Sequence, residues 1–453
     1  MKPRHGTARP GLIRSAAPLF LLALLPTAAA NAQTDDQPAA IARFSIGQQL
    51  ALDNGDVIGV TPLDLTFRRA TRSQTLDLGL SLPLTEGDPK QTNFIGFGDR
   101  QARLSYRRFA RNASLEAGLN YRETDLDREI FFDQDTGTLV TLDPGSVTTT
   151  SARLGYAFGS QAKLGGEFSL EYSRRAYSGT TDPDLVDSRT GSLAGRIYLE
   201  PTPLIRARIV AGADRTDSAG GGTDSRISQL GAGASLQVSK AANLDLETTW
   251  TDIRRVERDT GLSRRARGVA LRLNGSLARP AGEYTVAFSS EPDTAGRRED
   301  LLLGRSIRTP RYDLSFALGA TRFAGSIDPI FQAGYARDLG PVSDITASLS
   351  RVPVVDNDGN EAINTNFEAA YSRQFDEISS LSGSIRYRES QVQSGDALNA
   401  KTFAISIDYS RALTADLSLN AGYTMVRGKS GDGSRNDDER LFLGINRSFD
   451  FLP

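Results

Sequence analysis

The stretch LGGEFSLEY, from Leu164 to Tyr172, places an apolar or small residue at every second position. The positions between them carry Gly165, Glu167, Ser169 and Glu171. A helix would repeat its apolar residues about every 3.6 positions, whereas a strand alternates its side chains with a period of two. The stretch therefore predicts a β-strand with one apolar face and one polar face.

Runs of the same kind recur along the whole chain. Clear examples are Leu76–Leu84, Leu115–Tyr121, Val269–Leu273, Tyr312–Leu318, Phe403–Tyr409 and Leu441–Phe451. They predict about 22 strands between Phe44 and Phe451, within a range of roughly 18 to 24. The first run, Phe44–Leu52, and the fourteenth, Leu301–Ile307, carry the weakest alternation.

The apolar face of each strand must be buried against something. A sandwich buries it against a second sheet, and a transmembrane barrel buries it against lipid while its lumen stays polar. The number of strands, the polar character of the second face and two classes of link favour the barrel. The short links are Phe158–Lys163, Ser239–Asn243, Arg373–Ile378 and Arg411–Asp416, and the long ones are Thr124–Ser146, Ser178–Arg189, Arg215–Arg226, Ser290–Asp300 and Gly428–Glu439.

We therefore expect an all-β chain that forms a single antiparallel transmembrane β-barrel over residues 43–453. Short periplasmic turns, long extracellular loops and two periplasmic termini are typical of such barrels with an even strand number. The alternative is a secreted solenoid or a multi-sandwich adhesin.

Tyrosines mark the ends of many runs. An amphipathic ring sits well at the level of lipid headgroups, and an arginine nearby can reach past it to phosphates. Two membrane girdles are therefore expected, one before the short turns and one before the long loops. Their members are Tyr106, Tyr156, Tyr335, Tyr371 and Tyr409 in the first girdle, and Tyr121, Tyr172, Tyr387 and Tyr423 in the second.

Residues 1–32 have the organisation of a secretory signal peptide. Basic residues come first, the apolar run Ala16–Leu25 follows, and small residues precede an expected cleavage after Ala32. A membrane anchor is the alternative, but the run is shorter than the ~20 residues that span a bilayer. We expect residues 33–42 to be a short periplasmic segment with no room for a plug domain, which argues against a plugged siderophore-type receptor. We expect the protein to reside in the outer membrane.

Composition excludes several chemistries. The chain has no cysteine, and its one histidine, His5, lies in the expected signal peptide. Thiol chemistry, Cys/His metal sites and histidine bases are therefore excluded, no cofactor is implied and no enzyme is expected. After cleavage, 49 basic residues face 55 acidic ones, so nothing suggests a nucleic-acid partner.

Charged residues of both signs recur on the face expected to line the lumen. They form either a charged pore lining that selects solutes or a network of ion pairs that only holds the wall round. The pair Arg206 and Arg208 is the best local candidate for an anion contact. The expected pore-lining residues are Arg153, Arg196, Arg206, Arg208, Arg272, Arg386, Arg388, Glu116, Glu167, Glu171, Asp245, Glu247, Glu368 and Asp408, with Glu283 and Asp313 on the same face.

Two acidic loops, Asp133–Gly137 and Asp356–Glu361, resemble shortened calcium loops but lack the full twelve-residue spacing. Hydrated surface loops are the simpler interpretation, so no metal site is expected. The glycines of Gly96–Gly98 and Gly220–Gly222 precede no helix and are interpreted as loop glycines rather than a phosphate site.

The signal, the alternation and the hairpin motif resemble those of Gram-negative outer-membrane β-barrels. The motif reads YARDLGPVSDI from Tyr335, YSRQFDEISSL from Tyr371 and YSRALTADLSL from Tyr409, and is similar to barrels found with exopolysaccharide secretion systems. The resemblance implies a conduit, with outer-membrane lipid, lipopolysaccharide, the outer-membrane assembly machinery and secretion-system components as partners. The end of the sequence departs from the pattern, because Leu452 and Pro453 follow the aromatic Phe451.

Two functions are compatible with the sequence. The first is a pore or export conduit for hydrophilic solutes or polysaccharide. The alternative is a non-conducting scaffold, adhesin or receptor barrel whose extracellular loops bind a partner. A conduit requires a continuous water path, so conductance across a planar bilayer distinguishes the two.

Overall fold

The computed structural model describes residues 40–87, 95–126, 131–132, 139–140, 145–180, 185–220, 222–323, 325–355, 361–392, 399–429 and 435–451. Nearly all of these residues belong to β-strands. Within these ranges the chain forms no helix of the length and apolarity needed to cross a membrane.

Twenty-five strands form one sheet, and β9 and β10 form a separate two-stranded sheet. The strands of the first half are β1 (Ala40–Asp53), β2 (Asp56–Thr61), β3 (Leu63–Ala70), β4 (Gln74–Ser81), β5 (Leu84–Glu86), β6 (Ile95–Phe97), β7 (Gln101–Ala110), β8 (Ala113–Asp125), β9 (Phe131–Phe132), β10 (Leu139–Val140), β11 (Ser146–Phe158), β12 (Leu164–Ser178), β13 (Ser188–Thr202) and β14 (Ile205–Ser218). Those of the second half are β15 (Thr223–Gln237), β16 (Ala242–Glu257), β17 (Ser263–Arg279), β18 (Gly282–Asp293), β19 (Gly296–Arg308), β20 (Tyr312–Phe323), β21 (Ser326–Gly340), β22 (Ser343–Val355), β23 (Glu361–Gln374), β24 (Ser379–Val392), β25 (Ala400–Ala412), β26 (Leu417–Lys429) and β27 (Arg435–Phe451).

Three strands of the wall are each interrupted once. Strand β1 pairs with β3 along its first half and with β2 along its second, so β2 and β3 are two parts of one strand. Pro62 separates them, because proline has no N–H to give to the ladder. β4 with β5, and β6 with β7, continue each other in the same way, and counted so the wall has 22 strands.

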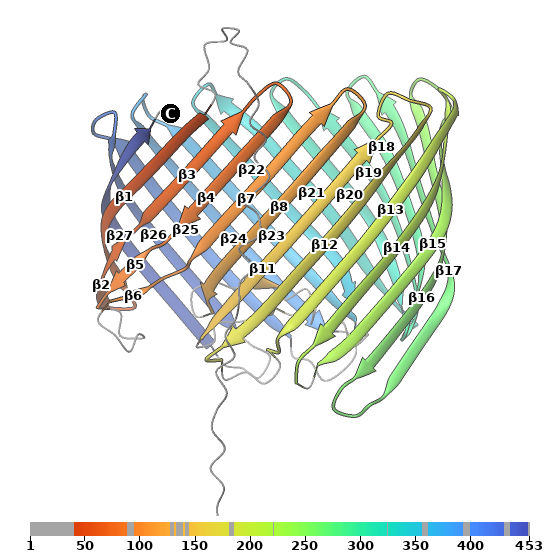
Figure 1. The fold of residues 1–453 in the computed structure, drawn as a ribbon, viewed down its shortest axis with the longest axis horizontal. Helices are drawn as coiled ribbons and strands as arrows, with labels where there is room; N and C mark the ends of the chain where they lie inside the picture. The colour runs from red at the N-terminus through yellow and green to blue at the C-terminus, as the bar shows by residue number, and fades with distance from the viewer. Residues whose placement is uncertain are drawn as a thin grey trace, which may run out of the picture. The chain divides into compact units, whose positions relative to one another are not determined.

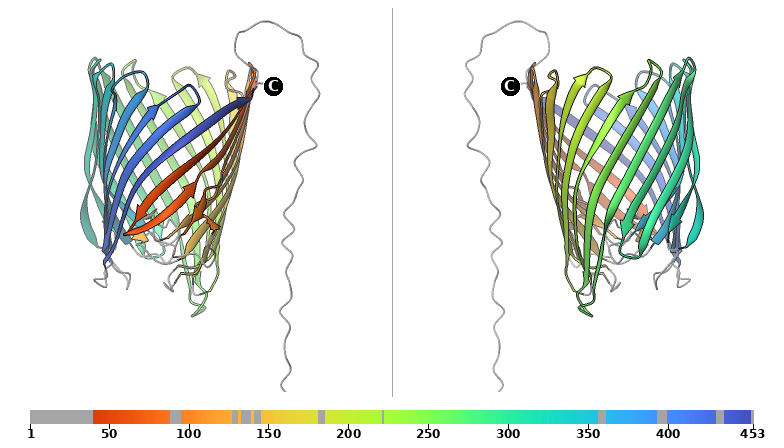
Figure 2. Two further views of the ribbon diagram at one scale, coloured as in Figure 1. Left: turned by 90° about the vertical axis from the view of Figure 1, so that its left-hand side faces the viewer. Right: turned by 90° about the vertical axis from the view of Figure 1, so that its right-hand side faces the viewer.

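The sheet closes on itself as an antiparallel barrel (Figures 1 and 2). Strand β1 pairs with β27 from Ala42 opposite Phe451 to Asp53 opposite Arg440. Arg43 and Asp450, which are 407 residues apart in the sequence, form an ion pair of 2.6 Å across this seam. The predicted single barrel is confirmed, and the two weakest predicted strands are present as β1 and β19.

The two ends of the barrel differ. The start of β1, the end of β27 and links of two to five residues lie at one end, the upper end in Figure 1, which we call the terminal rim. The opposite end, which we call the distal rim, carries the longest links, together with two-residue links such as 54–55. Three of the predicted long loops were too long, because only 219–222, 294–295 and 430–434 lie between the strands there. Hydrogen bonding between strand backbones does not require apolar side chains. The strands therefore extend beyond their apolar segments into polar segments that form the rim.

Side chains close several turns of the terminal rim. The carboxylate of Asp376 accepts hydrogen bonds from the Ser379 hydroxyl at 2.6 Å and from the Ile378 N–H at 3.0 Å. The Ser379 hydroxyl makes the larger contribution, and the two bonds lower the pKa of Asp376. The pKa of Asp416 is lowered by the Thr414 hydroxyl and then by Arg447.

The outer surface of the wall is apolar. Ile209, Leu230, Trp250, Leu303 and Leu318 all leave more than half of their surface exposed. A soluble protein rarely exposes so much contiguous apolar surface, whereas a transmembrane barrel turns such a band to lipid. This band lies between the two rims.

Candidate functional site

A cavity shows which face of the strands is the inner one. It has a volume of about 420 Å³ and is lined by residues from eight strands, with Glu116 on β8 and Arg272 on β17 among them. Strands so far apart in the wall can share one cavity only on its concave side. Glu167 and Arg196 line the same cavity, so the polar face of the strands is the inner face.

The structure distributes the fourteen expected lumen residues over two parts of the wall. Ten lie on β8, β11–β14, β16 and β17, and all of these residues except Arg153, Glu171 and Arg208 line this cavity or a second one. The other four, Glu368, Arg386, Arg388 and Asp408, lie on β23–β25. We call the first set the inner charged wall; it comprises Glu116, Arg153, Glu167, Glu171, Arg196, Arg206, Arg208, Asp245, Glu247 and Arg272.

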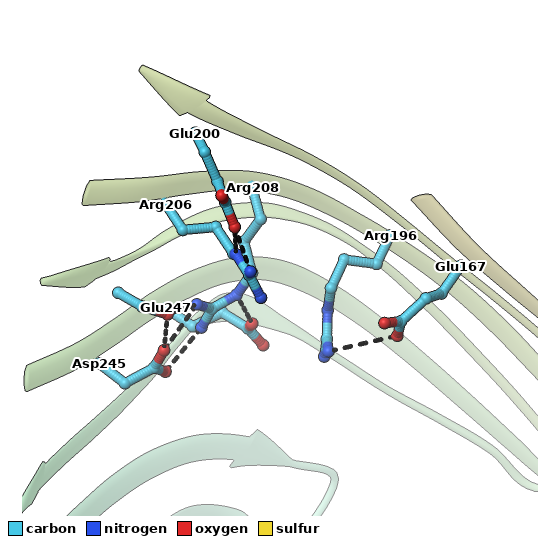
Figure 3. Close-up of polar contacts among 8 residues, drawn as sticks. Glu167, Arg196, Glu200, Arg206, Arg208, Asp245 and Glu247 are labelled. Carbon is cyan, nitrogen blue, oxygen red and sulfur yellow. Dashed lines mark hydrogen bonds and ion pairs between the residues drawn. The ribbon is translucent and has the colours of Figure 1, made fainter. Parts of the chain in front are cut away.

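Arg208 is the centre of the inner charged wall (Figure 3). Its two terminal nitrogens donate to the two oxygens of Asp245, both at 2.7 Å, and its Nε donates to Glu247 at 2.9 Å. One terminal nitrogen also donates to the Ser235 hydroxyl at 3.1 Å. The side chains of Arg208 and Glu247 are only 8% and 12% exposed. Such a buried, bidentate arrangement fixes three strands relative to one another.

Gly233 makes this arrangement possible. Arg208 lies on β14 and its carboxylate partners on β16, so the guanidinium must cross β15, where Gly233 is its direct neighbour. A β-carbon at position 233 would lie 2.8 Å from Cζ of Arg208 and 2.7 Å from the carbonyl oxygen of Leu246. No larger residue fits between them without a shift.

Arg206 is also engaged. It forms an ion pair with Glu200 (Figure 3). Its guanidinium lies 4.9 Å from the centre of the Tyr198 ring. Glu200 and Arg206, together with Asp245, line part of a second cavity of about 490 Å³. An anion at the predicted Arg206 and Arg208 pair would therefore compete with carboxylates already in place.

Most of the remaining charges form ion pairs that are more exposed than that of Arg208. Exposed ion pairs join Arg196 to Glu167 at 3.9 Å, Arg107 to Glu116 at 3.8 Å, Arg272 to Glu291 at 2.7 Å, Arg386 to Glu368 at 3.4 Å and Arg308 to Asp313 at 3.4 Å. The partners Arg107, Glu200, Glu291 and Arg308 were not predicted. They follow the same alternation, but they stand near the strand ends, where the apolar pattern that marks a strand fades.

Arg153 and Glu171 behave differently from the rest of the inner charged wall. They are direct cross-strand neighbours on β11 and β12, and both are exposed. Neither makes a hydrogen bond or an ion pair with any residue that the structure describes. These two groups are thus free to contact something that enters the barrel.

Tyr106, Tyr156, Tyr335, Tyr371 and Tyr409 lie nearer to the terminal-rim ends of their strands, whereas Tyr172 and Tyr423 lie near the middle of β12 and β26. Tyr156 and Tyr172 are 45% and 44% exposed on the outer face. Toward the distal rim, the hydroxyl of Tyr121 donates to Glu123 at 2.8 Å and that of Tyr387 donates to Glu389 at 3.0 Å. Their role as membrane girdles stays a prediction.

Metal binding finds no support among the described residues, where no group of three His, Cys, Asp or Glu side chains could hold an ion. The loop residues Asp133–Gly137 lie outside the described residues, as do 356–360 of the second acidic loop. The expected signal peptide, residues 1–32, also lies outside them.

Comparison with known proteins adds the class of the fold. No family model matches the chain, and no curated protein matches it. Among solved structures, the ferric-catecholate import receptor Fiu of E. coli K12 has a TM-score of 0.57 at 10% identity, covering 92% of this chain and 82% of its own. The FrpB iron transporter of Neisseria meningitidis has a TM-score of 0.59 at 8% identity, with coverage of 91% and 82%. FpvA of P. aeruginosa, solved with bound pyoverdines, has a TM-score of 0.57 at 10% identity, with coverage of 90% and 72%.

The closed wall and these likenesses define the class of fold: a single antiparallel β-barrel of the kind found in Gram-negative outer-membrane receptors, consistent with the resemblance noted in the sequence. The chain shares the barrel fold of iron-transport receptors. The sequence identities of 8–10% show similarity of fold only. The comparisons give no support to the exopolysaccharide link that the hairpin motif implied.

Proposed function

We propose that the protein is a receptor-type outer-membrane barrel that binds a polar, charged solute at its inner charged wall. The observation that carries the proposal is the free pair Arg153 and Glu171, which are direct cross-strand neighbours on the inner face. The likeness to import receptors favours a receptor over an unselective pore. Of the two functions compatible with the sequence, the receptor barrel is thus preferred to the export conduit.

The inner charged wall divides into a support and a contact surface. Arg208 with Asp245 and Glu247 is buried and satisfied, so it is the support. Arg153 and Glu171 are free, and the exposed pair of Arg196 and Glu167 is 3.9 Å apart. Exposed pairs of this kind contribute only about 0–1 kcal/mol, so a charged solute can replace one partner at little cost.

Ferric chelates are the first solutes to test. The similar barrels are described as receptors for ferric enterobactin and ferric catecholates and as a complex with ferric pyoverdine. Such chelates are polar and charged, which suits a wall that carries both signs of charge. Transport rather than catalysis is the proposed role, because the sole histidine lies in the expected signal peptide.

The experiment is calorimetric titration of the detergent-purified barrel with ferric enterobactin and with ferric pyoverdine. We expect saturable binding of at least one chelate, and a loss of about tenfold or more in R153Q/E171Q, since charge-assisted hydrogen bonds are the strong ones. The matched control is E368Q/R386Q, which removes an exposed inner pair from a different part of the wall. Equal losses in both variants, or no binding of either chelate by the wild type, would contradict the proposal.

A second function, a passive conduit for hydrophilic solutes or polysaccharide, rests on the exposed charges beside the two cavities. A barrel of 22 strands encloses a wide lumen unless something fills it. The protein refolded into a planar bilayer would then show steady conductance whose ion selectivity shifts in R153Q. Conductance without chelate binding favours the conduit, and chelate binding without conductance favours the receptor.

A further inference from the structure

Four arginines form a row on the outer face near the distal rim. Arg215 on β14, Arg226 on β15, Arg254 on β16 and Arg265 on β17 are direct cross-strand neighbours in that order. All four side chains are exposed. Neighbouring strands lie about 4.8 Å apart, so the outer arginine row is a line of like charges at close spacing.

The position of the row relative to the apolar band is fixed by the same register. Leu230, Trp250 and Val269 are also direct cross-strand neighbours, and they are 62%, 55% and 48% exposed. Each lies four residues before or after the arginine of its own strand, on the same face. Four residues of strand correspond to about 13 Å. The row therefore stands just beyond the apolar band.

The positive charge of the row is not compensated at its centre. Arg215 pairs with Asp217 at 2.9 Å, and Arg265 pairs with Asp252 at 2.6 Å. Arg226 and Arg254 make no hydrogen bond or ion pair with any residue the structure describes. Like charges directly opposite each other in a sheet destabilise it. An anion from outside the protein would relieve this repulsion.

Nearby cations add to the charge. Arg267 also forms an ion pair with Asp252, the partner of Arg265. Asp224, the nearby acid on β15, forms an ion pair with Arg258 at 2.9 Å. On the outer face of the two preceding strands, β12 and β13, Arg174 and Arg189 are direct cross-strand neighbours. Neither forms a hydrogen bond or an ion pair with any residue that the structure describes. The surface over β12–β17 is thus strongly basic.

We propose that the outer arginine row binds the phosphate groups of a phosphorylated, multiply acylated lipid of the outer leaflet, the lipid A part of lipopolysaccharide. A guanidinium presents its donors in a fork that matches phosphate. Two phosphates on one headgroup can be held by Arg226 and Arg254, while the acyl chains lie along Leu230, Trp250 and Val269. A row of cations at the edge of an apolar surface fits this ligand better than it fits a free anion, which gains nothing from the apolar row.

The test uses Trp250, the only tryptophan of the chain, which lies on the outer face four residues from Arg254. The detergent-purified barrel is titrated with bisphosphorylated lipid A while the fluorescence of Trp250 is recorded. We expect saturable binding that weakens about tenfold or more in R226Q/R254Q and that is lost with the dephosphorylated lipid. The matched control is R373Q/R411Q, which removes two exposed outer arginines near the terminal rim and should bind as the wild type does.

Three outcomes would overturn the proposal. The first is equal binding of phosphorylated and dephosphorylated lipid, and the second is equal binding by R226Q/R254Q and wild type. The third is displacement of lipid A by inorganic phosphate at similar concentrations, which would assign the row to a free anion. Far-UV circular dichroism and heat-modifiable gel migration establish that each variant is folded.

Discussion

The guanidinium of Arg208 crosses strand β15 over Gly233, its direct cross-strand neighbour, and reaches two carboxylates on the strand beyond. The absence of a side chain at position 233 is what leaves room for it. A single glycine therefore decides whether three strands of the inner charged wall are joined by one buried cation.

Gly233→Ala should destabilise the barrel by about 2–4 kcal/mol, because the added carbon displaces Arg208 from its buried partners. Urea unfolding in detergent or lipid, followed by Trp250 fluorescence, measures this. Gly79→Ala is the matched control, since a β-carbon there would meet nothing within 4 Å. Equal stability of the two variants would show that Arg208 does not depend on the gap.

Arg208→Met should cost about 3–5 kcal/mol, because it leaves the buried carboxylate of Glu247 without its partner. The triple variant R208M/D245L/E247L removes all three charges and should recover most of that loss, since apolar replacement of a buried network is often neutral. The same unfolding measurement applies. A triple variant as unstable as Arg208→Met alone would mean that packing, and not charge, accounts for the loss.

Trp250 should report lipid contact directly. It is 55% exposed within the apolar band, so its emission in vesicles should be blue-shifted and quenched by brominated lipid, while aqueous iodide should quench it little. Trp250→Phe provides the blank. Strong quenching by iodide in the folded protein would place this face in water and contradict the membrane assignment.

The turns of the terminal rim should weaken in acid. The folded-state pKa values of Asp376 and Asp416 are lowered by their hydrogen bonds, so their stabilisation is present above the unfolded value of about 3.9 and is lost as the pH falls through the folded value. Amide exchange at Ile378 and Leu417 should therefore show less protection at pH 2.5 than at pH 6, beyond the intrinsic effect of pH. D376N/D416N should lack this difference, and a difference that persists in it would exclude the two carboxylates as its cause.

The alternation of apolar and polar residues predicts the strand number well because every barrel strand meets lipid on one face and the interior on the other. The same signal misplaces strand ends. Around Ser290–Asp300 both faces are polar, so strands that continue beyond the apolar band resemble loops in the sequence. Pro62 and Pro83 interrupt strands without ending them, which only the pairing with neighbouring strands reveals.

The candidate site is predictable in part for a related reason. The alternation of side chains along each strand places Arg208, Asp245 and Glu247 on the inner face. It cannot tell which of them are in contact, because that depends on the register between strands and on Gly233. The outer arginine row could not be predicted from the alternation for the same reason. Arg215, Arg226, Arg254 and Arg265 are scattered in the sequence, and only the pairing of β14–β17 aligns them.

The seam between β1 and β27 has a consequence for how the wall is connected. Ala42 and Phe451 are direct partners, so the two ends of the strand series lie about one strand spacing apart. A short glycine linker from Phe451 to Ala40, with new ends opened in the turn between β13 and β14, would produce a circular permutant that retains every rung of the ladder. The order of the strands in the wall therefore does not depend on where the chain begins, and the new chain ends can be placed in any of the turns.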